Sequence, residues 1–170
     1  RALFSMSSGW TSITETGTYV SATSMWFHRV WPSLPFCTID IQQSHVHKAR
    51  SRGLYAICGD SAVVLDGIVD WLGDKPFFFL DAHWGERWPL ADELAAIYRL
   101  ADPVVLVHDF DDQTGAKYDP GNDIGGPVGV FLASRPDIVP YRLIGNSVIG
   151  VGLLTRPPID IKYWEAMIRR

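Results

Sequence analysis

Short apolar runs alternate with amphipathic stretches along most of this chain. The runs have strand length, and the stretches between them show the spacing of helices with one apolar face. The expected strands are residues 12–18, 36–41, 54–58, 77–80 and 104–107, and the expected helices are residues 22–30, 45–52, 62–72 and 89–100. Gly53 and Gly73 follow two of these helices, at positions that suit a left-handed helix end.

Regular alternation of strands and helices predicts a parallel, doubly wound sheet. The run FFFL at residues 77–80 contains no polar residue, which is typical of a central strand covered on both faces. Residues 141–144 and 148–154 are separated only by Gly-Asn-Ser, too short for a parallel crossover, so they favour an antiparallel pair. We therefore predict an α/β, Rossmann-like doubly wound sheet, mostly parallel with an antiparallel C-terminal hairpin. The polar stretch of residues 111–127 is expected to form an ordered surface loop or lid.

Composition places the chain among ordinary globular domains. It has 170 residues, of which 47% are hydrophobic and 20% charged, so we expect residues 1–170 to form one domain. The net charge of -4 and scattered basic residues argue against a nucleic-acid partner. No apolar stretch approaches the roughly 20 residues that span a bilayer. Cys37 and Cys58 each lie in an apolar run, which predicts buried free thiols and a reduced, cytoplasmic setting.

Polar residues follow the first expected strand, in the segment ETGTYVSAT at residues 15–23. Gly17 allows a tight turn and close backbone approach, and the next helix offers free N–H groups at its start. Tyr19 and Ala22 stand where a dinucleotide fingerprint requires glycine. The segment therefore favours a cofactor without a pyrophosphate, with an ordinary strand–helix turn as the alternative.

Acidic residues end the next two strands. Asp40 lies about 20 residues beyond Gly17, where Rossmann-type domains place an acid that accepts hydrogen bonds from ribose hydroxyls. Asp60 and Ser61 follow the third strand and could contact a ligand or cap the following helix.

Two further strand ends carry groups suited to catalysis or metal binding. Asp81 and His83 follow the FFFL run, and His108 and Asp109 follow the run at residues 104–107. Carboxylates and imidazole at adjacent strands could hold a divalent cation, and His83 could act as a general base. A hydrogen-bonded network without metal is the alternative.

Together these segments resemble the class I S-adenosylmethionine-dependent methyltransferases, in particular the small-molecule O-methyltransferases of the catechol type. The resemblance implies cofactor contacts from the strand ends, catalytic roles for Asp81 and His83, and a divalent cation such as Mg²⁺ bound by three residues. The implied cofactor-binding residues are Glu15, Gly17, Tyr19, Thr23, Asp40, Asp60 and Ser61, and the implied metal ligands are Asp81, His108 and Asp109.

The chain departs from the family pattern at several positions. A glycine is missing near Ser21, His108 replaces a carboxylate, and Gly85 stands where the catechol enzymes carry a lysine. Helices that usually precede the first strand are largely absent, which suggests a trimmed or minimal form.

These features predict a methyltransferase that acts on a small-molecule substrate and that could form a homo-oligomer. The alternatives are a metal-dependent hydroxylase or hydrolase on the same scaffold and a cofactor-binding module whose catalytic site has decayed. Nicotinamide chemistry is disfavoured because the glycine fingerprint is absent.

Overall fold

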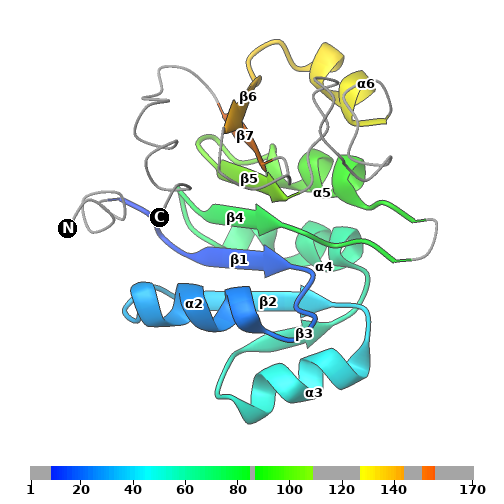
Figure 1. The fold of residues 1–170 in the computed structure, drawn as a ribbon. Helices are drawn as coiled ribbons and strands as arrows, with labels where there is room; N and C mark the ends of the chain where they lie inside the picture. Colours follow the sequence, from blue (N-terminus) through cyan, green and yellow to red (C-terminus); the bar gives the residue numbers. More distant parts are fainter. Residues whose placement is uncertain (1–8, 85–86, 109–126, 144–150, 156–170) are drawn as a thin grey trace.

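The computed structural model describes residues 9–84, 87–108, 127–143 and 151–155 of the chain. Five strands of this part form a parallel sheet in the order β3-β2-β1-β4-β5 (Figure 1). They are β1 (Ile13–Thr16), β2 (Phe36–Asp40), β3 (Ala56–Cys58), β4 (Phe77–Leu80) and β5 (Val104–His108). The predicted Rossmann-like α/β class is confirmed.

The last two strands join the sheet through antiparallel pairs. Strand β7 (Val151–Thr155) pairs antiparallel with β5 on one side and with β6 (Val139–Leu143) on the other. The bounds of β6 and β7 are shifted from the residues expected for the hairpin. Residues 111–126 of the predicted loop lie outside the described residues.

Helices connect the strands as the sequence pattern predicts. They are α2 (Ala22–Val30), α3 (Gln43–Ser51), α4 (Ser61–Ile68), α5 (Leu90–Ile97) and α6 (Pro127–Ser134), together with a 3₁₀ turn η1 (Val69–Trp71). The helix expected at residues 22–30 has these bounds, and the other predicted helices begin or end at different residues. The helix expected at residues 62–72 is thus divided into α4 and η1. Gly53 and Gly73 adopt the expected left-handed conformation, with φ of +83° and +89°. The sequence pattern does not predict α6, because its sequence, PVGVFLAS, is apolar on all sides and shows no helical period.

Both faces of the sheet are covered, as the FFFL run predicts. Phe77 and Phe79 of β4 contact Phe27 of α2 at 5.6 Å between ring centroids, on the face that α2 covers (Figure 1). Phe78 and Leu80 point to the other face, where the core continues into α4, α5 and α6. Burying each such side chain contributes roughly 1.5–3 kcal/mol, so this alternation on β4 joins the two layers of helices.

The two cysteines differ in their surroundings. Cys37 is buried in β2, as predicted, and the prediction for Cys58 is wrong because its side chain is exposed. Cys58 lies on β3, the edge strand of the sheet, which leaves its thiol uncovered. Both thiols are free. Among the described residues, no helix has the length and apolar character needed to cross a membrane.

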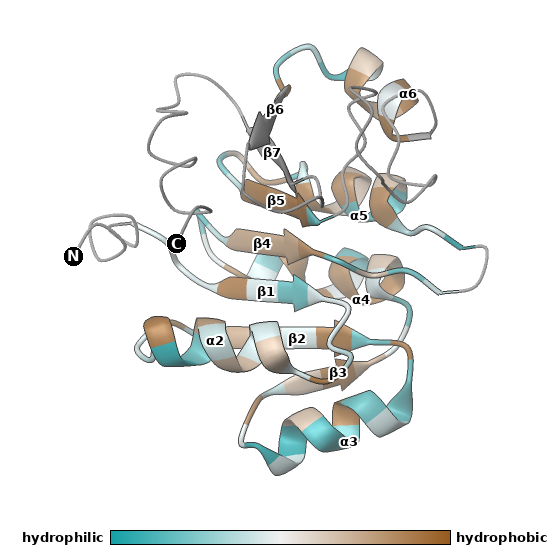
Figure 2. Ribbon diagram, viewed as in Figure 1, coloured by the Kyte–Doolittle hydropathy of each residue, from teal (hydrophilic) through white to brown (hydrophobic). Residues whose placement is uncertain are grey.

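Strand β1 lies at the centre of the sheet although three of its four residues are polar. Thr14, Glu15 and Thr16 are all buried. In Figure 2 the carboxyl end of β1 is coloured as hydrophilic, whereas the neighbouring strand β4 is coloured as hydrophobic. Buried polar groups need hydrogen-bond partners, so they concentrate where a protein builds a polar site. The carboxyl end of β1 is therefore a candidate position for the functional site.

Gly17 joins the carboxyl ends of three strands. Its N–H donates to the carbonyl of Ile39 on β2 at 2.9 Å. Its φ is +83°, and a Cβ atom at this position would lie 2.3 Å from the carbonyl oxygen of Asp81, just after β4. Only glycine allows this approach, because any other side chain would overlap the backbone of Asp81.

We predict that Gly17→Ala destabilises the protein much more than Gly53→Ala. Both glycines have φ of +83°, but nothing lies within 4 Å of a Cβ at Gly53. Gly53→Ala should cost about 1–2 kcal/mol from the left-handed backbone alone. Gly17→Ala should cost at least about 2 kcal/mol more because the Asp81 backbone must move. Urea unfolding of both variants measures the difference, and equal losses would contradict the close contact.

Candidate functional site

A cavity of about 580 Å³ lies beyond the carboxyl ends of β1, β2 and β4. The chain passes from β1 to β2 and β3 on one side and returns to β4 on the other, so strand order reverses here. Open α/β sheets bind their ligands at such a point. The lining residues are Gly17, Tyr19, Ile39, Asp40, Ile41, Gln42, His45, Ser61, Asp81, Ala82, His83 and Trp84.

The turn after β1 keeps a left-handed backbone at three alternate positions. Gly17, Tyr19 and Ser21 have φ of +83°, +43° and +60°. A side chain in this conformation costs about 1–2 kcal/mol, so Tyr19, in the wall of the cavity, and Ser21, at the start of α2, both store strain. Ser21, near which the family pattern expects a glycine, thus has a left-handed backbone of the kind that glycine adopts most readily.

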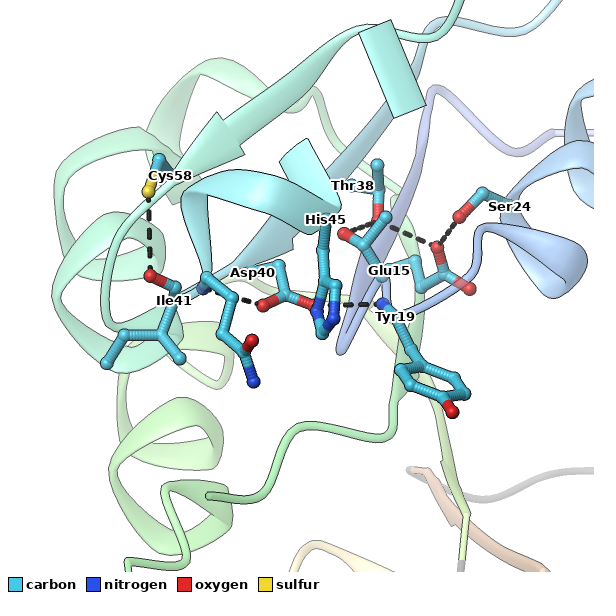
Figure 3. A network of polar contacts seen from close by, with 10 residues as sticks. Glu15, Tyr19, Ser24, Thr38, Asp40, Ile41, His45 and Cys58 are labelled. Atoms are coloured by element: carbon cyan, nitrogen blue, oxygen red, sulfur yellow. Dashed lines mark hydrogen bonds and ion pairs between the residues drawn. The ribbon is translucent and has the colours of Figure 1, made fainter. Parts of the chain in front are cut away.

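Asp40 anchors this turn. Its carboxylate is only 8% exposed and lines the cavity together with Gly17. Oδ2 accepts hydrogen bonds from the backbone N–H of Tyr19 at 2.9 Å and from Nδ1 of His45 at 3.0 Å, as Figure 3 shows. Oδ1 accepts from the N–H of Gln42 at 2.8 Å. The two groups that the sequence hypothesis depends on, Gly17 and Asp40, thus face one crevice.

Glu15 lies beneath the turn and does not line the cavity. Its Oε2 accepts hydrogen bonds from the hydroxyls of Ser24 and Thr38, the latter at 2.7 Å (Figure 3). Burial raises the pKa of Glu15 to about 7, although these two hydrogen bonds act in the opposite direction. Thr23, on α2, is also absent from the cavity wall. The structure therefore groups Gly17, Tyr19 and Asp40 at the cavity, whereas Glu15 and Thr23 do not line it.

Asp60 has the capping geometry that the sequence analysis offered as its alternative role. Its Oδ1 accepts the N–H of Ala62 at 3.0 Å at the start of α4, and its Oδ2 lies 3.1 Å from Nε of Arg87. Asp60 does not line the cavity, whereas its neighbour Ser61 does. Of this predicted pair, only Ser61 is placed to meet a ligand in the cavity.

Glu93 is a second buried carboxyl close to the cavity floor. It belongs to α5 and is 1% exposed. Burial raises the pKa of Glu93 to about 7, and the nearby hydroxyls of Ser61 and Thr16 lower it in part. Because Ser61 lines the cavity, Glu93 supports the cavity wall from behind.

Asp81 and His108 come together at the ends of adjacent strands, as predicted. Oδ1 of Asp81 lies 3.0 Å from Nδ1 of His108. Asp81 and His83 line the cavity, and the exposed ring of His83 lies 5.1 Å from the ring of Trp88. Asp109 lies outside the described residues. Within the described part of the chain, no group of three His, Cys, Asp or Glu side chains is arranged to hold a metal ion.

Several lining residues were not foreseen from the sequence. Ile41, Gln42 and His45 follow Asp40 directly, and Ala82 and Trp84 lie in the segment after β4. Their positions just after a strand could have indicated these residues, because residues that follow a parallel strand lie at the same edge of the sheet as the strand end. The sequence predicts only that His45 begins a helix, since sequence spacing alone does not show which way a side chain points.

Comparisons with known proteins identify the fold. No family model and no curated protein matches the sequence. Human methyltransferase-like protein 13, solved with S-adenosylhomocysteine, is 11% identical with a TM-score of 0.65, covering 100% of this chain and 87% of its own.

Two further solved structures give the same picture. Magnesium protoporphyrin IX methyltransferase from Synechocystis PCC 6803, with bound S-adenosylmethionine, is 12% identical with a TM-score of 0.57, covering 92% of this chain and 74% of its own. A plantazolicin methyltransferase, solved with S-adenosylhomocysteine and a triazolic desmethyl analogue, is 10% identical with a TM-score of 0.60, covering 86% and 77%. At such identities the likeness establishes the fold, which is that of class I methyltransferases.

We predict that Glu93→Gln stabilises the protein above neutral pH and has little effect in acid. The carboxyl is protonated in the folded state below about pH 7 and in the unfolded state only below about pH 4.5, so its contribution to stability falls as pH rises through this window. Gln keeps the neutral form, and the gain at pH 8 should be about 1–3 kcal/mol.

Urea unfolding of wild type and Glu93→Gln at pH 4.5 and pH 8 measures this effect. Glu15 is present in both proteins, so its own titration cancels in the difference. A variant that is equally destabilised at both pH values would contradict the prediction.

Proposed function

We propose that this protein is an S-adenosylmethionine-dependent methyltransferase that methylates a hydroxyl group of a small molecule. The observation that carries the proposal is the shared cavity of the left-handed Gly17 turn and the Asp40 carboxylate, at the point where strand order reverses. Its volume of about 580 Å³ lies within the range of small-molecule sites. The fold is one that several methyltransferases, solved with S-adenosylmethionine or S-adenosylhomocysteine, also have.

The residues of the cavity fit an adenosine-bearing cofactor without phosphates. Asp40 would accept a ribose hydroxyl, since Oδ1 still has room for one more hydrogen bond. Ile39, Ile41 and Trp84 supply apolar walls for a flat base, and Ser61 supplies a polar group beside them. The turn at Gly17 and Tyr19 would face the methionine portion. The other predicted cofactor residues, Glu15, Thr23 and Asp60, would act by supporting this wall.

Protein groups next to the cavity can accept the proton of an acceptor hydroxyl. The bound cofactor would supply an electrophilic methyl group, which the hydroxyl oxygen attacks in line as the carbon–sulfur bond breaks. His83 lines the cavity and is exposed, so it can take up the hydroxyl proton and return it to solvent. Asp81 lies beside it and holds His108. Most of the rate gain would come from holding the two reactants in line.

A divalent cation remains a prediction and has no part in the proposed reaction. The two described members of the expected ligand set contact each other through Oδ1 of Asp81 and Nδ1 of His108. This contact uses one carboxylate oxygen of Asp81 and one ring nitrogen of His108, so these two atoms are not open to a metal ion. We therefore favour proton transfer by side chains over metal assistance.

We predict that S-adenosylhomocysteine binds in the micromolar range and that Asp40→Asn weakens binding about 10–100-fold, because an amide accepts ribose hydroxyls less strongly than a carboxylate. Isothermal titration calorimetry measures both constants. Asp66→Asn is the matched control. Asp66 lies on α4, is exposed, pairs with Arg99 and does not line the cavity. No heat from wild-type protein would contradict the whole proposal.

We predict that His83→Asn lowers kcat by about 10²–10⁴-fold and changes S-adenosylhomocysteine affinity by less than about threefold. The assay follows transfer of a radiolabelled methyl group from S-adenosylmethionine to a panel of small phenols. His47→Asn is the control, because His47 is exposed on α3 and away from the cavity. Binding without transfer to any phenol in wild type would favour a decayed cofactor-binding module instead.

A further inference from the structure

Asp40 has fewer open acceptor positions than a ribose requires. An ionised carboxylate offers about four lone-pair positions, two on each oxygen. Both positions on Oδ2 are taken, by the N–H of Tyr19 and by Nδ1 of His45. One position on Oδ1 is taken by the N–H of Gln42, which leaves a single position open. A vicinal diol that donates two hydrogen bonds to one carboxylate needs two open positions.

Of the three donors on Asp40, only His45 can leave without unfolding a turn. The N–H of Tyr19 is fixed by the left-handed backbone after β1, and the N–H of Gln42 by the start of α3. His45 donates from a side chain in the first turn of α3 that is 21% exposed and lines the cavity. Rotation of the imidazole about its side-chain bonds would release Oδ2.

We propose that His45 competes with the ligand for Asp40: its imidazole occupies the acceptor position that the second ribose hydroxyl needs, and ligand binding displaces it. This inference rests on the proposed function, since it assumes a ligand with a diol in this cavity. The edge of one ring faces the other in the contact between His45 and Tyr19, with 5.4 Å between centroids, so Tyr19 helps to hold the imidazole in the blocking position.

His45 can donate from Nδ1 to Asp40 either as one neutral tautomer or as the doubly protonated ring, and the strength of the contact differs between the two states. A doubly protonated imidazole is a cation and pairs with the carboxylate more strongly than the neutral ring does. Acid therefore strengthens the blocking contact and weakens ligand binding. Other titratable groups also lie in this region: Tyr19 on the β1 turn, Asp81 and His83 across the cavity, and Glu15 beneath. His47 and Lys48 are on α3 itself but do not line the cavity.

The test compares wild type with His45→Ala by calorimetry with S-adenosylhomocysteine at about pH 8 and about pH 5.5. Wild-type affinity should fall about tenfold on going to the lower pH, and His45→Ala should bind about tenfold more tightly than wild type there. The ratio of the two affinities removes the titrations of Glu15, Asp81 and His83, which both proteins share.

A second variant separates the proton from the hydrogen bond. His45→Asn keeps a donor for Asp40 but has no group that titrates, so its affinity should equal that of wild type near pH 8 within about threefold and should show less weakening in acid. His47→Ala, on the same helix and outside the cavity wall, should follow wild type at both pH values.

The outcomes separate this inference from the function it rests on. If wild type binds S-adenosylhomocysteine and His45→Ala binds it more weakly at both pH values, His45 positions Asp40 or contacts the ligand, and the competition is overturned while the function stands. If the affinity ratio is the same at both pH values, the competition is likewise overturned. If no protein of the set binds at either pH, the proposed function falls and this inference with it.

Discussion

The carboxylate of Asp40 is the contact on which the site depends. It ties the turn after β1 to the end of β2 by accepting the N–H of Tyr19, and this bond holds a backbone that non-glycine residues otherwise avoid. The close approach of Gly17 to the backbone of Asp81 ties the same turn to β4. Three strand ends are thereby locked around one cavity, which gives the preorganised wall that a small-molecule site requires.

The residues buried around Asp40 and Gly17 include polar groups and do not form a uniformly apolar core. Glu15 and Glu93 both lie beneath the strand ends, and burial raises the pKa of each to about 7. The hydroxyls of Ser24 and Thr38 donate hydrogen bonds to Glu15. The hydroxyls of Ser61 and Thr16 lie near Glu93 and lower its pKa in part. Because their pKa values are raised, these carboxyl groups lower the stability of the fold when they ionise at alkaline pH. We expect a protein to keep such destabilising groups where they support a polar cavity.

The hydrophobic pattern was enough to predict most of the fold and half of the cavity wall. The alternating runs predicted the five parallel strands and their positions along the chain. The FFFL run correctly predicted a strand covered on both faces. The pattern missed α6, whose apolar residues face in every direction, and it placed Cys58 inside, because a sequence does not tell an edge strand from a central one. Strand ends predicted the places of Gly17, Asp40, Ser61, Asp81 and His83 at the cavity.

By itself the sequence determined which strands end at the ligand edge of the sheet, since parallel strands with crossover helices bring all their carboxyl ends to one side. Only the tertiary structure decided how each side chain is used. Glu15 turns beneath the sheet end and Asp60 caps α4, whereas His45, which carried no signal in the chain, reaches Asp40. The reason is physical: side-chain direction and hydrogen-bond partners depend on groups that are distant in sequence, and these meet only when the strands pack side by side.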